Sequence, residues 1–69
     1  MNTAKVAEVY AFIEETEKHI SFAEVPNRIY IEMAAQLGIT TSELTMIYSG
    51  WMAQWSPERF MEIWDGTAA

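Results

Sequence analysis

Apolar side chains recur at intervals of three and four residues along most of the chain, and this spacing predicts helices. Thr3 is the expected N-cap of the first helix, because threonine commonly caps helix N-termini. Phe12 lies beside the apolar stripe of this helix and widens the face that packs on a core. The stripe itself consists of Val6, Val9, Tyr10 and Ile13.

A second helix is predicted from Pro26 to Leu37. Proline suits the first turn of a helix because its missing N–H would be unpaired there in any case. Ser21 and Glu24 have the spacing of a capping box, but the residue before the proline favours extended backbone, which supports the later start. Gly38 permits the left-handed conformation that ends a helix. The inward face is expected to comprise Ile29, Met33, Ala34 and Leu37.

A third helix is predicted to open at Thr40, which has capping-box spacing with Glu43. Gly50 costs about 1 kcal/mol relative to alanine inside a helix, so a break or kink there is an open alternative. We expect the helix to continue through it. The apolar stripe then comprises Leu44, Ile47, Trp51 and Trp55.

A last helix is predicted to open with Ser56 as cap and Pro57 at the first helical position, and to end at Gly66. Its apolar side comprises Phe60, Ile63 and Trp64. Residues 67–69 are expected to form a frayed tail. The predicted fold is therefore all-α, with about four helices in a small bundle that forms a single domain over residues 1–66.

The composition of the 69 residues, 51% apolar with three glycines and two prolines, favours a compact domain over disorder. A chain of this length buries only about 60% of the surface that its unfolded form exposes, so a core of its own is marginal. The absence of cysteine and the single histidine exclude disulfides and the usual zinc ligand sets, and we expect no cofactor. Association is the remaining common source of stability, so we expect a homodimer.

Ten acidic residues against four basic ones give a formal net charge of -6, which disfavours nucleic acid and anionic lipid as partners. The bases, which are too scattered to form a nucleic-acid-binding patch, are Lys5, Lys18, Arg28 and Arg59. From Met33 to Pro57 the one charged residue is Glu43. No apolar run approaches the ~20 residues of a membrane span and no signal peptide is recognisable, so we expect a cytoplasmic protein.

Residues Tyr30–Trp51 resemble the helix-turn-helix of bacterial and phage repressors. Ala34 matches the small residue where the two helices cross closely, and Gly38 matches the turn glycine, where a Cβ would oppose the positive φ. The other matches are the apolar positions Leu37, Ile39, Leu44 and Ile47. The resemblance implies a helix-turn-helix-like pair within the bundle, whose second helix enters the major groove of DNA.

The chain departs from that family in the chemistry of the second helix. By matching positions, the side chains that face DNA are Thr40, Thr41, Ser42, Thr45, Met46 and Ser49. None of them is a cation or an amide, the groups that most often read base edges. Direct DNA binding is therefore disfavoured. A dimeric DNA-binding transcriptional regulator stays as the alternative function, with contacts from Thr41, Ser42, Thr45 and Arg28.

The third helix is also predicted to expose a second apolar surface, because one helix cannot hide all of its aromatic and thioether side chains. Tyr, Trp and Met are enriched at protein interfaces. The candidate protein-interaction residues are Tyr48, Met52, Met46, Trp51, Thr45 and Glu43. We therefore expect a protein-binding module, an inhibitor or anti-activator that occupies the basic, DNA-binding surface of a regulatory protein. In size and charge the chain resembles the small early proteins with which bacteriophages disable host factors. Self-assembly through the aromatic surface is a third possibility.

Residue pairs capable of catalysis are few. Glu15 and His19 are four residues apart and share a helix face, but two groups without a third ligand do not make a metal or acid–base site. His19 is better explained as a favourable cation near a helix C-terminus. Nothing in the sequence suggests an activated serine nucleophile and no glycine-rich phosphate loop is present, so an enzyme is not expected.

Overall fold

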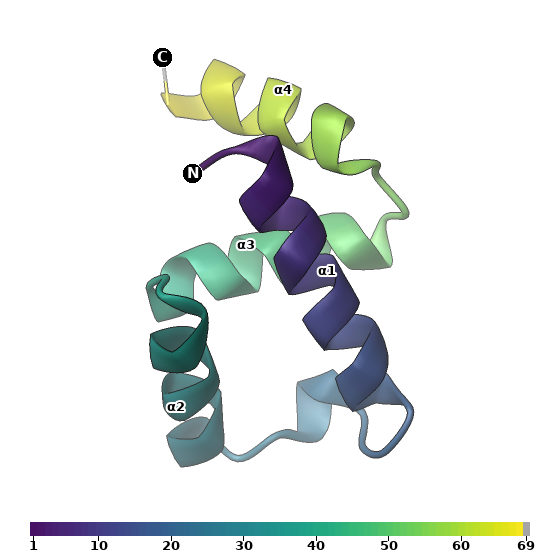
Figure 1. Cartoon of the computed structure of the whole chain (residues 1–69), viewed down its shortest axis with the longest axis vertical. Helices are drawn as coiled ribbons and strands as arrows, with labels where there is room; N and C mark the ends of the chain where they lie inside the picture. Colours follow the sequence, from purple (N-terminus) through teal and green to yellow (C-terminus); the bar gives the residue numbers. More distant parts are fainter. Residues whose placement is uncertain (69) are drawn as a thin grey trace.

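The computed structural model describes residues 1–68, with side chains through residue 66, and this part of the chain contains helices and no strand. The elements are α1 (Thr3–Glu17), the short 3-10 helix η1 (Phe22–Glu24), α2 (Asn27–Leu37), α3 (Thr41–Met52) and α4 (Pro57–Ala68). In Figure 1, α1 crosses α3 near the middle of the molecule, α4 lies across the start of α1 at one end, and η1 and α2 lie at the other end. The all-α prediction is confirmed.

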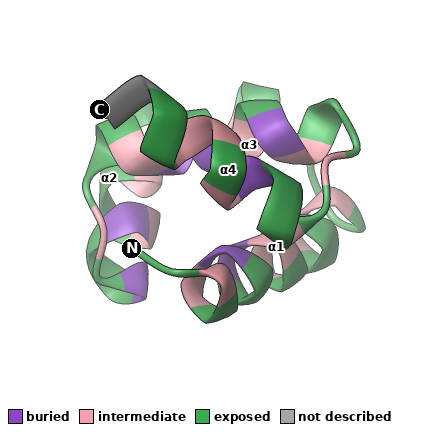
Figure 2. Cartoon of the chain, turned by 90° about the horizontal axis from the view of Figure 1, so that it is seen from above, coloured by how far each residue is buried: buried purple, intermediate pink, exposed green. Residues whose placement is uncertain are grey.

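A common core joins every element. Its nine buried residues are Val6, Val9, Ile13, Phe22, Ala34, Leu37, Leu44, Ile47 and Phe60. The buried positions lie on the helix faces that turn toward one another (Figure 2). The inward stripe predicted for the first helix is largely confirmed. Each of the next two stripes is confirmed in half of its members: Ile29 and Met33 of the second and Trp51 and Trp55 of the third are only half-buried. Burying apolar surface contributes about 25 cal/mol per Å² to stability, so this cluster is the main source of stability.

Two local signals around the turn between α2 and α3 are confirmed. Gly38 adopts φ 74° and ψ 30°, the left-handed conformation that ends α2. The capping box at the start of α3 is complete: the Thr40 hydroxyl accepts from the backbone N–H of Glu43 at 3.0 Å, and the Glu43 carboxylate accepts from the N–H of Thr40 at 2.8 Å. Three residues therefore suffice to connect the two helices.

Replacing Thr40 by alanine is expected to lower the free energy of unfolding by about 1 kcal/mol, because the backbone N–H of Glu43 loses its acceptor. Urea unfolding followed by Trp fluorescence measures the change. Thr41→Ala is the matched control, because Thr41 is an exposed threonine one position later. An equal loss in both variants would contradict the assignment of the cap.

Two predicted helix starts are wrong by one residue. The N-cap of α1 is Asn2, not Thr3, and its side-chain oxygen accepts from the backbone N–H of Lys5 at 2.8 Å. Asn and Thr both cap helices, so the sequence alone did not separate adjacent candidates. The helix α2 begins at Asn27, and Pro26 occupies the capping position with extended backbone.

Two predicted helix ends also differ. The helix α3 continues through Gly50, as predicted, but ends at Met52 and does not include Trp55. Gln54 takes a positive φ of 63°, and the N–H of Trp55 bonds to the carbonyl of Gly50 at 3.0 Å, which closes the helix end. Gly66 does not end α4, which runs to Ala68, because among the described glycines only Gly38 takes a positive φ. Of the predicted tail, Ala69 lies outside the described residues.

Candidate protein-interaction site

The outer face of α3 is exposed and uncharged. Thr41, Ser42, Thr45 and Ser49 are all exposed. Met46 and Met52 are the most exposed apolar side chains of this helix, at 41% and 55%. Six residues correspond to about one and two-thirds helical turns, so the two methionines project from different flanks of α3. The structure therefore divides the predicted interaction residues between two sides of one helix.

Tyr48 is half-buried and belongs to the wall of the core. Its ring centroid lies 4.8 Å from that of Phe22 and 6.1 Å from that of Trp51, on which it stacks. Burial raises the pKa of the Tyr48 hydroxyl, and the carboxylate of Glu17 and the hydroxyl of Tyr30 add to the effect. Truncating Tyr48 would therefore disturb packing as well as any interface, which makes the exposed methionines better probes of binding.

The polar candidates on α3 already have partners within the chain. The Thr45 hydroxyl lies 2.6 Å from the hydroxyl of Tyr30 and donates to the carbonyl of Thr41 at 3.0 Å. The Glu43 carboxylate is held in the capping box with Thr40. Both side chains therefore stabilise the local structure, in addition to any role at an interface.

The basic residues belong to α1 and its C-cap Lys18, to α2 and to α4, and none lies on α3. Three of them form ion pairs one turn away on their own helix: Lys5–Glu8 at 3.3 Å, Lys18–Glu15 at 3.1 Å and Arg59–Glu62 at 3.2 Å. Arg28 is exposed in the first turn of α2 and has no carboxylate partner in the described chain. Such exposed pairs add little stability, but they neutralise the cations locally. The face of α3 therefore has no cluster of positive charge beside it.

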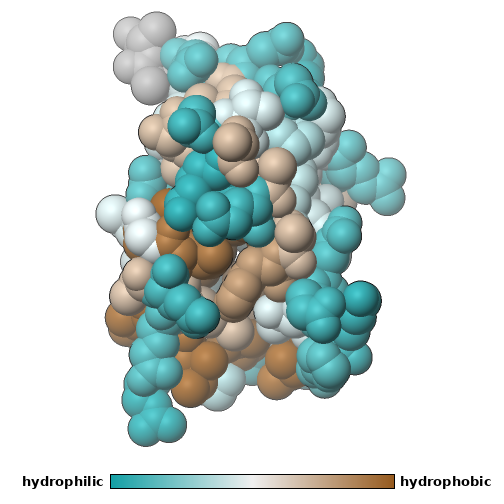
Figure 3. All heavy atoms as spheres, viewed as in Figure 1, coloured by the Kyte–Doolittle hydropathy of each residue, from teal (hydrophilic) through white to brown (hydrophobic). Residues whose placement is uncertain are grey.

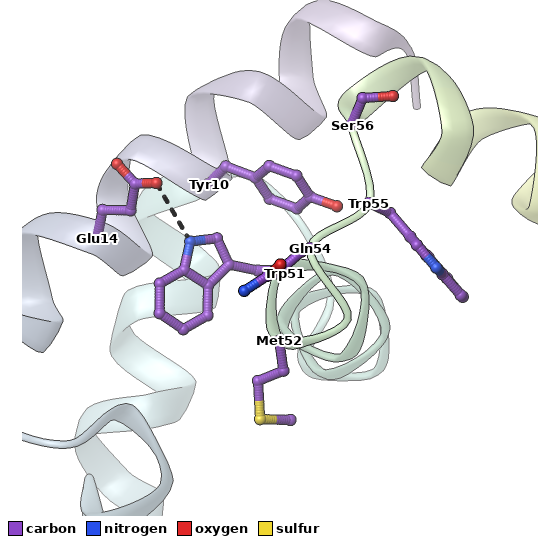
Figure 4. Close-up of a pocket in the computed structure, with 7 residues that line it drawn as sticks. All are labelled: Tyr10, Glu14, Trp51, Met52, Gln54, Trp55 and Ser56. Atoms are coloured by element: carbon purple, nitrogen blue, oxygen red, sulfur yellow. Dashed lines mark hydrogen bonds between the residues drawn. The ribbon is translucent and has the colours of Figure 1, made fainter.

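A hollow of about 730 Å³ lies between α1 and the segment that follows α3. Figure 4 shows Tyr10 and Glu14 projecting from α1 toward the end of α3, where Trp51 and Met52 line the other side. The indole N–H of Trp51 donates to the Glu14 carboxylate at 3.5 Å, a long hydrogen bond. The segment after α3 completes the lining with Gln54, Trp55 and Ser56.

Sequence reasoning missed this hollow. Tyr10 is predicted as part of the core stripe, and 37 positions separate Glu14 from Trp51. No local pattern connects residues that far apart. Of the predicted interaction residues, the hollow brings together Trp51 and Met52, and it leaves Met46, Thr45 and Glu43 elsewhere on α3.

The hydroxyl of Tyr10 is buried and has no hydrogen-bond partner among the described residues. The same burial raises the pKa of this phenol. Tyr10→Phe is therefore expected to leave the free energy of unfolding unchanged or to raise it by up to about 1 kcal/mol. Tyr30→Phe is the contrasting variant, because it removes a 2.6 Å hydrogen bond to Thr45 and should cost about 1 kcal/mol. Urea unfolding measures the free energy of unfolding of both variants. A larger loss of stability in Tyr10→Phe than in Tyr30→Phe would contradict the prediction.

In the described part of the chain, no helix combines the length and the apolar character that crossing a membrane requires. Comparison with protein-family models, with curated proteins and with solved structures finds no match to this chain.

Proposed function

We propose that the chain acts by binding another protein, as an inhibitor or anti-activator that occupies the basic, DNA-binding surface of a regulatory protein. The observation that supports the proposal is the charge distribution around α3. This helix has the length and the preceding tight turn of a groove-reading helix, yet it has no base, and three of the four bases elsewhere are paired with carboxylates. Because the chain as a whole has a net charge of -6, it repels phosphate and attracts cationic protein.

The proposed contact combines steering by charge with an apolar centre. The net charge of -6 accelerates encounter with a basic surface and makes the association rate sensitive to salt. Met52, more than half exposed beside the hollow, supplies a flexible thioether that adapts to the shape of a partner. Figure 3 shows one face of the molecule, on which hydrophobic side chains gather between hydrophilic ones. Binding through Met52 would bury apolar surface of an acidic chain.

The proposal includes a homodimer that acts in the cytoplasm, where DNA-binding regulators are found. A chain of 69 residues has only a marginal core of its own, and this favours association. Sedimentation of the purified chain at several concentrations tests the dimer. If the aromatic surface served self-assembly alone, the chain would associate without retaining any other protein.

The test of the main proposal is capture followed by competition. Immobilised wild-type chain is incubated with a bacterial lysate in parallel with a Met46→Gln/Met52→Gln variant, whose changes lie on the exposed face of α3. Ile31→Gln is the matched control, because it removes an equally exposed apolar side chain from α2. We expect DNA-binding proteins to be retained by the wild type and the control and to be lost from the double variant. The captured protein should then release its DNA when the chain is added in a gel-shift assay. Retention of no DNA-binding protein would overturn the proposal.

The alternative is a dimeric DNA-binding regulator. Three features favour it: the three-residue turn with left-handed Gly38, the buried Ala34 near that turn, and the exposed hydroxyls of Thr41 and Ser42. A gel shift with random-sequence duplex at low salt separates the two functions. Saturable binding with a steep salt dependence would favour the regulator, and loss of that binding in Arg28→Gln would assign a phosphate contact to Arg28.

A further inference from the structure

We infer that the hollow between α1 and the end of α3 receives the guanidinium group of an arginine from the partner protein, held against Trp51 by the carboxylate of Glu14. The inference rests on the proposed function, because it assigns one contact within the proposed interface. It uses residues that the sequence patterns did not bring together, and it specifies the side chain that the partner must present.

The position of Glu14 supports the inference. The Trp51 indole N–H donates a long hydrogen bond of 3.5 Å to one carboxylate oxygen, so the charge lies beside the indole ring. Glu14 is exposed, and no base of the described chain forms an ion pair with it. Lys18, one helical turn further along α1, is bonded to Glu15 instead. The carboxylate therefore keeps free lone pairs for an incoming cation.

The lining of the hollow favours an organic cation over other ligands. It contains three aromatic side chains, one carboxylate and no base. Cations bind aromatic faces through the ring quadrupole, and tryptophan is the strongest such partner. The amide of Gln54 and the hydroxyl of Ser56 add neutral hydrogen-bonding groups. An anion would meet repulsion from Glu14, and a purely apolar group would gain nothing from the carboxylate.

Arginine fits this lining better than lysine does. Its guanidinium is planar, so it stacks on an indole while its edge donates two hydrogen bonds to one carboxylate. The ammonium of lysine is compact and strongly hydrated, and it cannot make both contacts in the same way. A volume of about 730 Å³ is ample for one such side chain. The partner proposed above has a basic surface, which supplies arginines.

The experiment is a titration of the ¹⁵N-labelled chain with capped pentapeptides Gly-Gly-X-Gly-Gly, where X is arginine, lysine or the neutral isostere citrulline. The reporter is the indole N–H signal of Trp51, assigned by its disappearance in Trp51→Phe. We expect the arginine peptide to shift this signal in a saturable manner, the lysine peptide to bind more weakly, and citrulline to have no effect. Absence of a saturable shift with arginine would overturn the inference.

Two variants with the same change in net charge separate the site from general electrostatics. Glu14→Gln is expected to weaken binding of the arginine peptide about fivefold or more, whereas Glu15→Gln, one residue away and paired with Lys18, should stay within about twofold of wild type. Unchanged backbone amide spectra show that both variants are folded. Equal weakening in the two variants would mean diffuse attraction to an acidic surface and would overturn the inference.

The outcomes distinguish this inference from the proposed function. If a DNA-binding protein is captured equally by wild type and Glu14→Gln, the function stands and the arginine contact is wrong. If the arginine peptide binds at Glu14 but no DNA-binding protein is captured, the cation site stands and the proposed function is wrong.

Discussion

Phe60→Ala is expected to lower the free energy of unfolding by about 3–5 kcal/mol. Phe60 is 2% exposed and is the one fully buried side chain of α4 among the described residues, so it attaches this helix to the core. Its ring also stacks on Trp64, with a centroid separation of 6.0 Å. A domain of this size has a total stability of roughly 3–10 kcal/mol. The variant should therefore be at the edge of unfolding at 25 °C.

Urea unfolding monitored by Trp fluorescence and by circular dichroism measures the Phe60→Ala effect. Asp65→Ala, an exposed change on the same helix, is the control and should be close to neutral. If Phe60→Ala unfolds outright, Phe60→Leu, which keeps most of the apolar volume, brings the loss into the measurable range. A loss below about 1 kcal/mol in Phe60→Ala would mean that α4 is not docked as described.

Gly50→Ala is expected to lower the free energy of unfolding by about 1–3 kcal/mol, although helix propensity alone predicts a gain of about 1 kcal/mol. A Cβ at this position would stand 2.7 Å from Cδ2 of Phe60, 2.9 Å from the Tyr10 hydroxyl and 3.2 Å from Cε3 of Trp55. The Phe60 ring is buried and cannot swing away. A lower free energy of unfolding in Gly50→Ala would show that close packing dominates, and a higher one would show that helix propensity dominates.

Ser49→Ala is the matched control for Gly50→Ala, because it makes a change to the same residue type at the neighbouring exposed position. It should be neutral or slightly stabilising. Combining Gly50→Ala with Phe60→Leu is expected to cost less than the sum of the two single variants, because the smaller side chain makes room for the new methyl group. Strict additivity would show that the two residues do not contact each other.

Close packing at Gly50 also shapes the candidate site. The missing side chain leaves room for Tyr10 from α1 and Trp55 from the segment after α3 to approach the same point of the helix. Those two aromatic residues line the hollow together with Trp51. A variant that moves Tyr10 or Trp55 should therefore change the hollow as well as stability. Measuring the affinity of the Gly50→Ala variant for the arginine peptide tests whether packing at Gly50 also shapes the hollow.

The features that the sequence predicted correctly depend on contacts within a few residues. The stripe of Val6, Val9 and Ile13, the capping box of Thr40 and Glu43, and the left-handed Gly38 were all recognisable from spacing and residue type. A helix face, a cap and a turn each require residues that are at most about four positions apart. Local spacing therefore established that the chain is helical and where most helices lie.

Competition between similar local signals explains the misplaced boundaries. Asn2 and Thr3 are both residue types that cap helices, and the structure uses Asn2. Gly66 is a residue type that often ends helices, but it does not take the positive φ that such an end requires. The early end of α3 depends on Gln54, which adopts a left-handed conformation that is uncommon for residues other than glycine. The residue types around Gln54 do not predict this conformation.

Spacing along the chain could not identify the candidate site, because its parts come from two distant segments. Glu14 and Trp51 meet only because α1 crosses α3. They are 37 positions apart, and helical spacing relates only residues within a few positions of each other. Contact with Phe22 of η1 made Tyr48 part of the wall of the core, and Met52 lies beside the hollow. Helices form from neighbouring residues, whereas the burial of one face against another depends on the whole chain, and the chemistry of this surface follows from that second step.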